Sequence, residues 1–454
     1  MSNSSAAHWP LAKLRDITTK IGSGATPRGG KESYKNSGIT LIRSLNVYDF
    51  KFDIDGLAFI DDDQARELSN VEVHRFDILL NITGASVARC CIVPRQLLPA
   101  RVNQHVAIVR VNPILANPYY VLYVINSPHY KHHLLTLAQG GATREALTKD
   151  TIGDFEVPFP PLPTQRKIAA ILSAYDDLIE NNTRRIAILE EMAQALYREW
   201  FVHFRFPGHE KKRMVESALG MIPEGWEVVK VSAAVYIDPP TRLTKEGEKP
   251  FVPMGSLSNG SMLIDNIEYR AGNSGSKFKN GDTLFARITP CIENGKTGYV
   301  QFLPSDETVA FGSTEFIVLR SRTLCPEYVY LMARSNEFRD NAIKSMSGAT
   351  GRQRVQTACF DKFLIAQPDS AILTKFSEQI SPIFRSIHVL AKKNTNLRRT
   401  RDLLLPKLIS GEVDVEGLDI ETGEAMTEAT ASIEEDVKKS AEAALAGEQM
   451  MLWG

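Results

Sequence analysis

The sequence NPYYVLYVINS at residues 117–127 returns as CPEYVYLMARS at residues 325–335, and this repetition decides the fold. The two copies keep residues of the same kind at matching places, namely Pro118 and Pro326, Tyr120 and Tyr328, Val121 and Val329, Ser127 and Ser335, and Tyr130 and Phe338. Each copy continues through Gly-Ala-Thr, at residues 141–143 and 348–350, to Phe155 or Phe363 and a long helical pattern. A spacing of about 208 residues indicates a duplicated domain-plus-helix unit, whereas a solenoid would repeat every 20–50 residues.

Composition places the chain among ordinary globular proteins of more than one domain. Its 454 residues exceed one hydrophobic core, and 43% of them are apolar and 24% charged. It has no apolar run of the roughly 18 residues that a membrane span needs, and the start MSNSSAAHWPLAKL does not resemble a signal peptide. Five cysteines, an odd number without a C-x-x-C spacing, indicate reduced thiols, so we expect a cytoplasmic protein.

Charge is distributed unevenly along the chain. From Glu412 onward there are 12 acidic and 2 basic residues, which leaves 51 basic against 42 acidic residues before it. A basic body with an acidic tail is compatible with a polyanionic partner, although the balance alone is weak support. Residues 416–454 are expected to form an acidic, flexible tail, with a short docking helix at residues 441–453 as the alternative.

Each half is predicted to be a mixed α+β domain. Apolar, β-branched runs predict strands at residues 76–81, 91–93 and 106–111, followed by helices at 119–125 and 130–138. The second half repeats the order, with strands at residues 282–287, 298–302 and 315–320 and a helix at 327–335. The predicted domain boundaries are 1–160 and 207–370, with long helices at 161–206 and 371–415.

The first long helix carries an apolar seam with alternating spacings of four and three residues. Thr164 is expected to cap its start and Pro207-Gly208 to end it, and about 40 residues at a 1.5 Å rise give a rod of about 60 Å. A seam this long and narrow favours a coiled coil over a helix lying on its own domain's core. The residues chosen for helix pairing here are Leu172, Ile179, Asn182, Ile186, Leu189 and Leu196.

The second long helix is a less regular copy. Pro382 and Pro406 are expected to start, kink or end it locally, and Gly411 to end it. Asn182 and Asn394 occupy matching places, where they either form a buried pair that fixes the helix register or lie on solvated faces. For this helix the coiled coil and the domain-packed helix stay equal alternatives. Its pairing candidates are Ile387, Asn394, Leu397, Leu404 and Leu408.

Three motifs that suggest catalysis fail in detail. Residues 238–241, Asp-Pro-Pro-Thr, lack the aromatic fourth residue of an amino-methyltransferase loop, so we interpret them as a turn. Residues 24–31 lack the glycine and the Ser/Thr of a phosphate-binding loop, and the nine histidines show no metal-ligand spacing. We therefore expect no catalytic residues and no metal in this chain.

Polar residues that suit DNA contacts cluster on loops at equivalent places in both halves. Arg pairs with guanine edges, Asn and Gln with adenine, and Ser and Thr with phosphates or bases. Any one of them alone is more often a solvated loop residue, but their recurrence strengthens the group. The candidates are Asn81, Thr83, Ser86, Arg89, Arg101, Asn103, Gln104, Thr143 and Arg144 in the first half, and Arg287, Thr289, Lys296, Ser313, Thr314, Thr350, Arg352, Gln353 and Arg354 in the second.

From residue 9 to about 415 the chain resembles the specificity subunit of type I restriction–modification systems. The resemblance is carried by PPLPTQRKIAAILSAYDDLIENN from residue 160, GDTLFARITPCIENGKTGYV from residue 281, and LRRTRDLLLPKLISGEV from residue 397. It implies two target-recognition domains and two helices that pair antiparallel and set the spacing. Each domain would read one half of a bipartite, asymmetric DNA site.

The resemblance also implies partners and cofactors outside this chain. These are double-stranded DNA, two methyltransferase subunits with S-adenosylmethionine, and two restriction subunits that use ATP and Mg²⁺. The two halves depart from each other in two places. The first half has Asn81-Ile82 where the second has Ala286-Arg287. The second helix is preceded by Gln367-Pro368-Asp369-Ser370, which lacks the Pro-Pro-Leu-Pro-Thr-Gln sequence of the first. The halves are thus expected to read different bases. The alternatives are a coiled-coil scaffold without its own DNA readout and a self-sufficient methyltransferase or nuclease.

Overall fold

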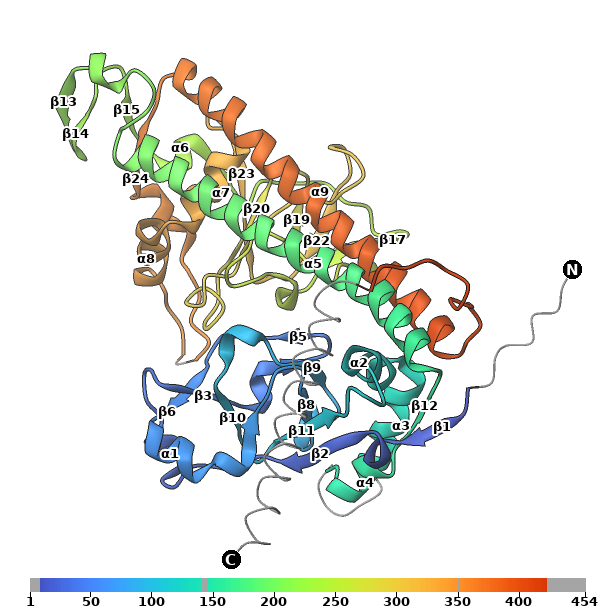
Figure 1. The fold of residues 1–454 in the computed structure, drawn as a ribbon. Helices are drawn as coiled ribbons and strands as arrows, with labels where there is room; N and C mark the ends of the chain where they lie inside the picture. Colours follow the sequence, from blue (N-terminus) through green and yellow to red (C-terminus); the bar gives the residue numbers. More distant parts are fainter. Residues whose placement is uncertain (1–8, 140–145, 350, 423–454) are drawn as a thin grey trace, which may run out of the picture. The chain divides into compact units, whose positions relative to one another are not determined.

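The computed structural model describes residues 9–139, 146–349 and 351–422. Its contacts divide the chain into two compact units. Unit 1 combines the described residues up to Ile179 with those from Asn396 onward, and unit 2 is Glu180–Thr395. Each unit is a mixed α+β domain with its own segments of the two long helices (Figure 1).

Unit 1 is built around two four-stranded sheets. The first is antiparallel with the order β2-β11-β8-β9, and the second has the order β6-β3-β10-β7 with β3 and β10 parallel. Their bounds are Thr18–Ser23 (β2), Val106–Val111 (β11), Ile78–Asn81 (β8), Cys90–Ile92 (β9), Ala58–Ile60 (β6), Ile39–Ile42 (β3), Ala100–Val102 (β10) and Glu72–Val73 (β7).

The apolar runs of β8 and β11 become strands that are buried on both faces. Successive side chains of a strand point to opposite faces, so one run supplies two cores. Ile78 and Leu80 join the core under helix α2 (Pro118–Asn126), whereas Leu79 and Ile108 join the core against the second sheet. The remaining elements of unit 1 are β1 (Leu11–Lys13), β4 (Val47–Tyr48), β5 (Lys51–Phe52), α1 (Asp62–Glu67), α3 (Pro128–Gln139), α4 (Lys149–Gly153) and β12 (Glu156–Pro158).

Unit 2 repeats the two four-stranded sheets of unit 1 in the same strand order. Its sheets have the orders β16-β23-β20-β21 and β18-β17-β22-β19, and β15–β24 repeats the β1–β12 pair. The strands are β13 (Met214–Ser217), β14 (Gly220–Pro223), β15 (Glu227–Lys230), β16 (Val235–Ile237), β17 (Glu248–Val252), β18 (Glu268–Ala271), β19 (Ser276–Phe278), β20 (Thr283–Ala286), β21 (Thr297–Tyr299), β22 (Ala310–Gly312), β23 (Phe316–Ser321) and β24 (Leu364–Gln367). Its short helices are α6 (Val231–Ala234), α7 (Pro326–Arg334) and α8 (Asn336–Lys344). The predicted fold class is confirmed.

The long helices are more continuous than the sequence predicted. Helix α5 spans Leu162–Tyr197 and ends in a π-helical turn, Arg198–Val202. Thr164 therefore lies inside the helix, and the expectation that it caps the start is wrong. Helix α9 spans Ser370–Ile409, and Asp369 Oδ1 accepts a hydrogen bond from Ile372 N at 2.9 Å at its start.

Of the three outcomes expected for each proline, a start, a kink or an end, the first and the last do not occur, because helix α9 runs through both prolines. Pro382 and Pro406 both lie within Ser370–Ile409, and both are exposed. A proline removes one backbone hydrogen bond of the helix. Burial of Ile380, Phe384 and Ile387 on the opposite face keeps the helix continuous through Pro382 despite that loss.

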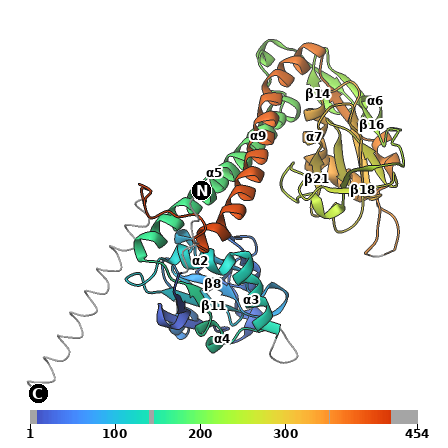
Figure 2. The same cartoon turned by 90° about the vertical axis from the view of Figure 1, so that its right-hand side faces the viewer.

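Within each unit the segments of α5 and α9 lie side by side (Figures 1 and 2). In unit 2, Asn182 Nδ2 donates to Asn394 Oδ1 at 2.9 Å, and the rings of Trp200 and Phe376 lie 5.6 Å apart. From the first contact to the second, the residue numbers rise along α5 and fall along α9, so the two helices run antiparallel. The coiled-coil and the domain-packed alternatives therefore hold together, because the residues that pair the helices also belong to the domain core. Ile186 and Ala193 share a core with Tyr328 of α7.

The other pairing candidates follow the same division between units. Leu172 is buried in the unit 1 core together with Leu408, and Leu404 packs against that core. Ile387 is buried in unit 2, where Leu189 and Leu196 are half-buried. Ile179 and Leu397 are half-buried. Among the described residues, no helix is both long and apolar enough to span a bilayer.

Candidate functional site

In unit 1, four polar side chains form a hydrogen-bonded row at one end of the first sheet. Thr26 follows β2, Thr83 follows β8, and Gln104 and His105 lie on the turn before β11. Thr26 Oγ1 donates to Gln104 Oε1, Gln104 Nε2 lies 3.2 Å from His105 Nε2, and His105 Nδ1 lies 2.8 Å from Thr83 Oγ1. Gln104 is exposed, and Thr83 and His105 are half-buried. The row thus presents hydrogen-bond donors and acceptors to solvent.

Backbone bonds fix the loops that carry this row. Asn103 is buried, and its Oδ1 accepts from His105 N at 3.2 Å while its own N donates to Ile42 O at 2.9 Å. Its side chain therefore shapes the turn that presents Gln104 and His105. Thr83 pairs with Ala146 in an antiparallel bridge.

Two sequence candidates of unit 1 are turned inward. Asn81 is fully buried at the end of β8, and its Nδ2 donates to Ser44 O at 2.9 Å. Arg101 is held by a bond from Nε to Ala65 O at 3.1 Å and by an ion pair with Glu72 at 3.5 Å. In this structure neither side chain is presented to a partner, which corrects their selection. Strands buried on both faces give no alternation from which their direction could be predicted.

The remaining candidates of unit 1 lie at its surface or outside the described residues. Arg89 is half-buried, with its guanidinium 5.0 Å from the centre of the Tyr48 ring. Ser86 is half-buried at the end of the 3-10 turn Gly84–Ser86. Thr143 and Arg144 of the first half, and Thr350 of the second, lie outside the described residues.

In unit 2, the equivalent place carries charges. Arg354 forks onto Glu315, with Nη2 to Oε1 at 2.6 Å and Nε to Oε2 at 2.9 Å. Hydrogen bonding by Arg354 holds the pKa of the Glu315 carboxyl below its usual value. Arg287 lies beside this pair, since its N donates to Glu315 O at 3.0 Å and its carbonyl accepts from Val355 N at 2.9 Å. The structure therefore brings Arg287 and Arg354 together.

Six more candidates belong to the loops around this group. Thr289 and Gln353 are joined by two bonds, from Thr289 N to Gln353 O and from Gln353 N to Thr289 Oγ1, both at 3.2 Å. Ser313 Oγ accepts from Glu315 N at 3.2 Å, and Thr314 next to it is exposed. Arg352 is also exposed, whereas Lys296 is half-buried with its Nζ 3.3 Å from Met254 O.

Arg287 and Thr314 also line a cavity of about 630 Å³ in unit 2. Asp238, Arg242 and Lys277 line the same cavity. The sequence pattern gave residues 238–241 no role beyond that of a plain turn, but in the structure these residues form part of the cavity wall. Sequence reasoning also missed Thr26 and His105, although Thr26 lies in the loop rejected as a phosphate site and His105 directly follows Asn103 and Gln104.

Equivalent backbone bonds align the two units residue by residue. Ile82 N donates to His105 O and Ile82 O accepts from Leu147 N, just as Arg287 N donates to Glu315 O and Arg287 O accepts from Val355 N. Ile82 thus corresponds to Arg287 and His105 to Glu315. The two units share their backbone here and differ in their described side chains, with Thr83 and His105 in unit 1 and the Arg354–Glu315 ion pair in unit 2. In the described part of the chain, no three His, Cys, Asp or Glu side chains form a group that could hold a metal.

Comparison with known proteins agrees with this architecture. Residues 7–191 match the family described as type I restriction modification DNA specificity domain. The MjaIX specificity subunit of Methanocaldococcus jannaschii is 26% identical over 421 residues, covering 90% of this chain and 94% of the relative. The HindI specificity subunit of Haemophilus influenzae is 21% identical over 422 residues, covering 76% of this chain and 90% of the relative.

A solved structure shows the same fold. The crystal structure of the S subunit of a type I restriction-modification system from M. genitalium aligns with a TM-score of 0.54 at 12% identity, over 90% of this chain and 98% of that chain. The chain thus shares the fold of that S subunit over most of its length. Residues 7–191 match the DNA specificity domain family, and the chain is similar in sequence to type I specificity subunits along most of its length.

Proposed function

We propose that this protein is the non-catalytic, sequence-specific DNA-binding subunit of a cytoplasmic type I restriction–modification complex. Unit 1 reads one half of a bipartite, asymmetric site in double-stranded DNA, and unit 2 reads the other half. Helices α5 and α9 set the spacing between the half-sites and dock two methyltransferase subunits. Those subunits carry S-adenosylmethionine, and two restriction subunits use ATP and Mg²⁺.

One observation carries this proposal. Two units with the same strand order present different side chains at matching positions, such as His105 and Glu315. Direct readout of DNA depends on the donors and acceptors that face the base edges. The amide, imidazole and hydroxyl groups in unit 1 and the Arg and Glu side chains in unit 2 select different bases. The pair therefore suits a site with two unlike halves.

The test is a methylation map. The chain is co-expressed with its methyltransferase partner, and modified adenines are located across a genome. The expected result is a motif of two short sequences separated by an unread spacer. A scaffold without DNA readout would give no such motif and no affinity for duplex DNA. Methyl transfer by this chain alone, with S-adenosylmethionine and DNA, would instead identify a self-sufficient enzyme.

Variants assign each half-site to a unit. Removing the charge of Arg352 or Arg354 is expected to weaken recognition of the second half-site and to leave the sequence preference of the first unchanged. Arg352 is the cleaner variant, because Arg354 is paired and its loss also frees Glu315. The opposite pattern, a changed first half-site, would contradict the assignment.

A further inference from the structure

The cavity in unit 2 is formed by four separate segments of the chain, and one of them is Arg287 after β20. The turn Asp238–Arg242 after β16 forms one wall, the start of β19 a second, and the beginning of β23 a third. Gly275 lies in the second wall with φ near +114°, and a Cβ there would lie 1.9 Å from Gly312 O. The backbone therefore needs glycine at this point, and the cavity is a defined part of the fold.

The cavity carries charges of both signs. Arg242, Lys277 and Arg287 line it together with Asp238, and the positive charge of Arg287 acts on the Asp238 carboxylate. Asp238 Oδ1 accepts from Val318 N at 2.8 Å, which holds the carboxylate against the sheet. The carboxylate stays accessible, yet loss of water on its protein side raises its pKa. An acceptor thus lies fixed beside cationic donors.

Arg287 has donors to spare. Among the described residues, its guanidinium makes one hydrogen bond, from Nη2 to Val355 O at 3.2 Å, and its Nε is buried without a partner. Neighbouring arginines of the unit are committed: Arg354 forks onto Glu315, and Arg320 forks onto Asp282. Because the Nε is buried, the N–H groups that Arg287 keeps for a ligand with two adjacent acceptors are those of Nη1 and the second N–H of Nη2.

The charges that line the cavity favour one kind of ligand. A phosphate would satisfy the cations but would be repelled by Asp238. Guanine presents O6 and N7 as adjacent acceptors in the major groove, and the N4 amino group of its cytosine partner is a donor beside them. An A·T pair presents no two adjacent acceptors on its purine. A guanidinium next to a carboxylate therefore matches a G·C pair.

We propose that this cavity reads one G·C base pair in the second half-site, with Arg287 donating to guanine and Asp238 accepting from the cytosine amino group. Arg242 and Lys277 bind the neighbouring phosphates. The proposal rests on the proposed function and adds the base pair and the residues that read it. It is specific to unit 2, because Gly22 replaces Asp238 and Ile82 replaces Arg287 at the equivalent backbone positions of unit 1.

The experiment uses the full chain co-expressed with its methyltransferase partner, and it maps methylated adenines for the wild type and four variants. Asp238→Asn keeps an oxygen for Val318 N, and Arg287→Gln removes the fork. Each is expected to relax one G·C position of the second half-site by about tenfold or more, with the first half-site unchanged. Arg242→Gln is expected to lower methylation at all sites alike. Lys245→Gln, at an exposed lysine outside the cavity, is the matched control.

Outcomes separate the two proposals. A wild-type map without a two-part motif contradicts the proposed function itself. A two-part motif whose second half contains no G·C pair overturns the cavity proposal alone. So does a motif that Asp238→Asn leaves with full discrimination at every position. If Arg287→Gln fails to fold by circular dichroism, Arg287→Lys replaces it, since an ammonium lacks the planar fork and is expected to relax the same position.

Discussion

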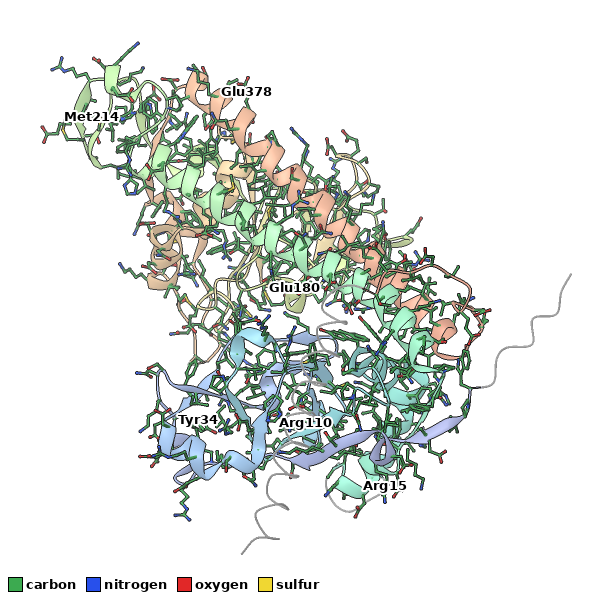
Figure 3. All side chains as sticks on the ribbon, viewed as in Figure 1. Arg15, Tyr34, Arg110, Glu180, Met214 and Glu378 are labelled. Atoms are coloured by element: carbon green, nitrogen blue, oxygen red, sulfur yellow. The ribbon has the colours of Figure 1, made fainter. Side chains whose placement is uncertain are left out.

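At the scale of single residues, a buried ion pair marks the duplication most clearly. Arg110, on β11 and labelled in Figure 3, forks onto Asp77 with both bonds at 2.8 Å. Arg320 on β23 forks onto Asp282 with both bonds at 2.7 Å. Each carboxylate also accepts from a backbone N three residues earlier, at His74 or Lys279. The pair closes the turn before the central strand in both units.

Removing one partner of this pair is expected to destabilise its own unit. The Asp77 side chain is 0% exposed and the Asp282 side chain 1%, so a lone arginine would stay beside an uncharged group. Asp77→Asn should lower the free energy of unfolding of unit 1 by about 3–5 kcal/mol, and Asp282→Asn should do the same to unit 2. Hydrogen exchange measured by peptide assigns each loss to its unit.

Asp154→Asn is the control for this prediction. Asp154 pairs with Lys13 and Arg15 at the surface, and its side chain is 50% exposed. Solvent-exposed pairs contribute little, so exchange should be unchanged. An equal loss in the control, or a loss in the unit that was not altered, would contradict the assignment.

Glu190 on α5 is a second informative residue. Its Oε1 accepts from Ser261 Oγ and Met262 N, both at 2.7 Å, and burial raises its pKa. A raised pKa means that the contribution of this group to stability is full below the unfolded pKa of about 4.3 and is lost as pH rises through the folded value. At neutral pH the negative charge of Glu190 therefore lowers the free energy of unfolding.

Glu190→Gln is expected to be at least as stable as the wild type at pH 7, because the amide oxygen keeps both bonds without a buried charge. The difference between the two unfolding free energies should narrow as pH falls toward 5. Glu190→Ala should lose about 1–3 kcal/mol at every pH, because Ser261 and Met262 N are left unpaired. Urea unfolding across this pH range tests it, and a Gln variant that is less stable at pH 7 would refute it.

At the scale of elements, the two long helices are joined by polar contacts within an apolar seam. Asn182 and Asn394 are 9% and 3% exposed, and Asn394 Nδ2 also donates to Thr183 Oγ1 at 3.2 Å. In unit 1, Asp176 accepts from Tyr123 OH at 2.6 Å and pairs with Arg401 of α9. Buried polar pairs allow one helix register and penalise others.

The asparagine pair is expected to behave as one unit in a double-mutant cycle. Asn182→Leu alone should cost about 1–3 kcal/mol, because the buried Oδ1 of Asn394 loses the hydrogen bond from Asn182 Nδ2. Replacing both asparagines with leucine should cost clearly less than the sum of the two single changes. Denaturant unfolding measures all four corners. Strict additivity would show that the two side chains do not interact.

At the scale of the whole molecule, one backbone plan supports two different surfaces. The sheets keep their strand orders in both units. The loops at their ends carry different side chains, with Thr83 and His105 in unit 1 and the Arg354–Glu315 pair in unit 2. Folding and recognition are thereby separated, since core residues maintain the scaffold and loop residues change without disturbing it.

Salt dependence is expected to separate phosphate contacts from base contacts in the proposed complex. With the methyltransferase partner present, affinity for the cognate duplex should fall steeply with salt. Arg352→Gln, at an exposed arginine, should reduce the slope of log affinity against log salt by about one and leave the sequence preference of the first half-site unchanged. Binding titrations at several salt concentrations test this, and an unchanged slope would remove Arg352 from the phosphate contacts.

The sequence by itself determined the duplication, the mixed α+β class, and the positions of the central strands and of α2 and α7. Apolar periodicity and repeated prolines and tyrosines are local signals, so they survive without a structure. It also picked out the loops that carry Arg287, Thr314 and Arg354, and the structure places these loops next to one another; their role in DNA contact stays a prediction.

Only the tertiary structure decided which side chains face outward and what they meet. Asn81 and Arg101 point inward because their strands are buried on both faces, a condition that removes the alternation from which direction is predicted. Asp238 joined the site because sheet pairing brings residues 238, 277, 287 and 314 to one cavity. Helix α9 continued through Pro382 because long-range burial outweighed a local preference. Contacts between distant residues decided each of these outcomes, and no local pattern records them.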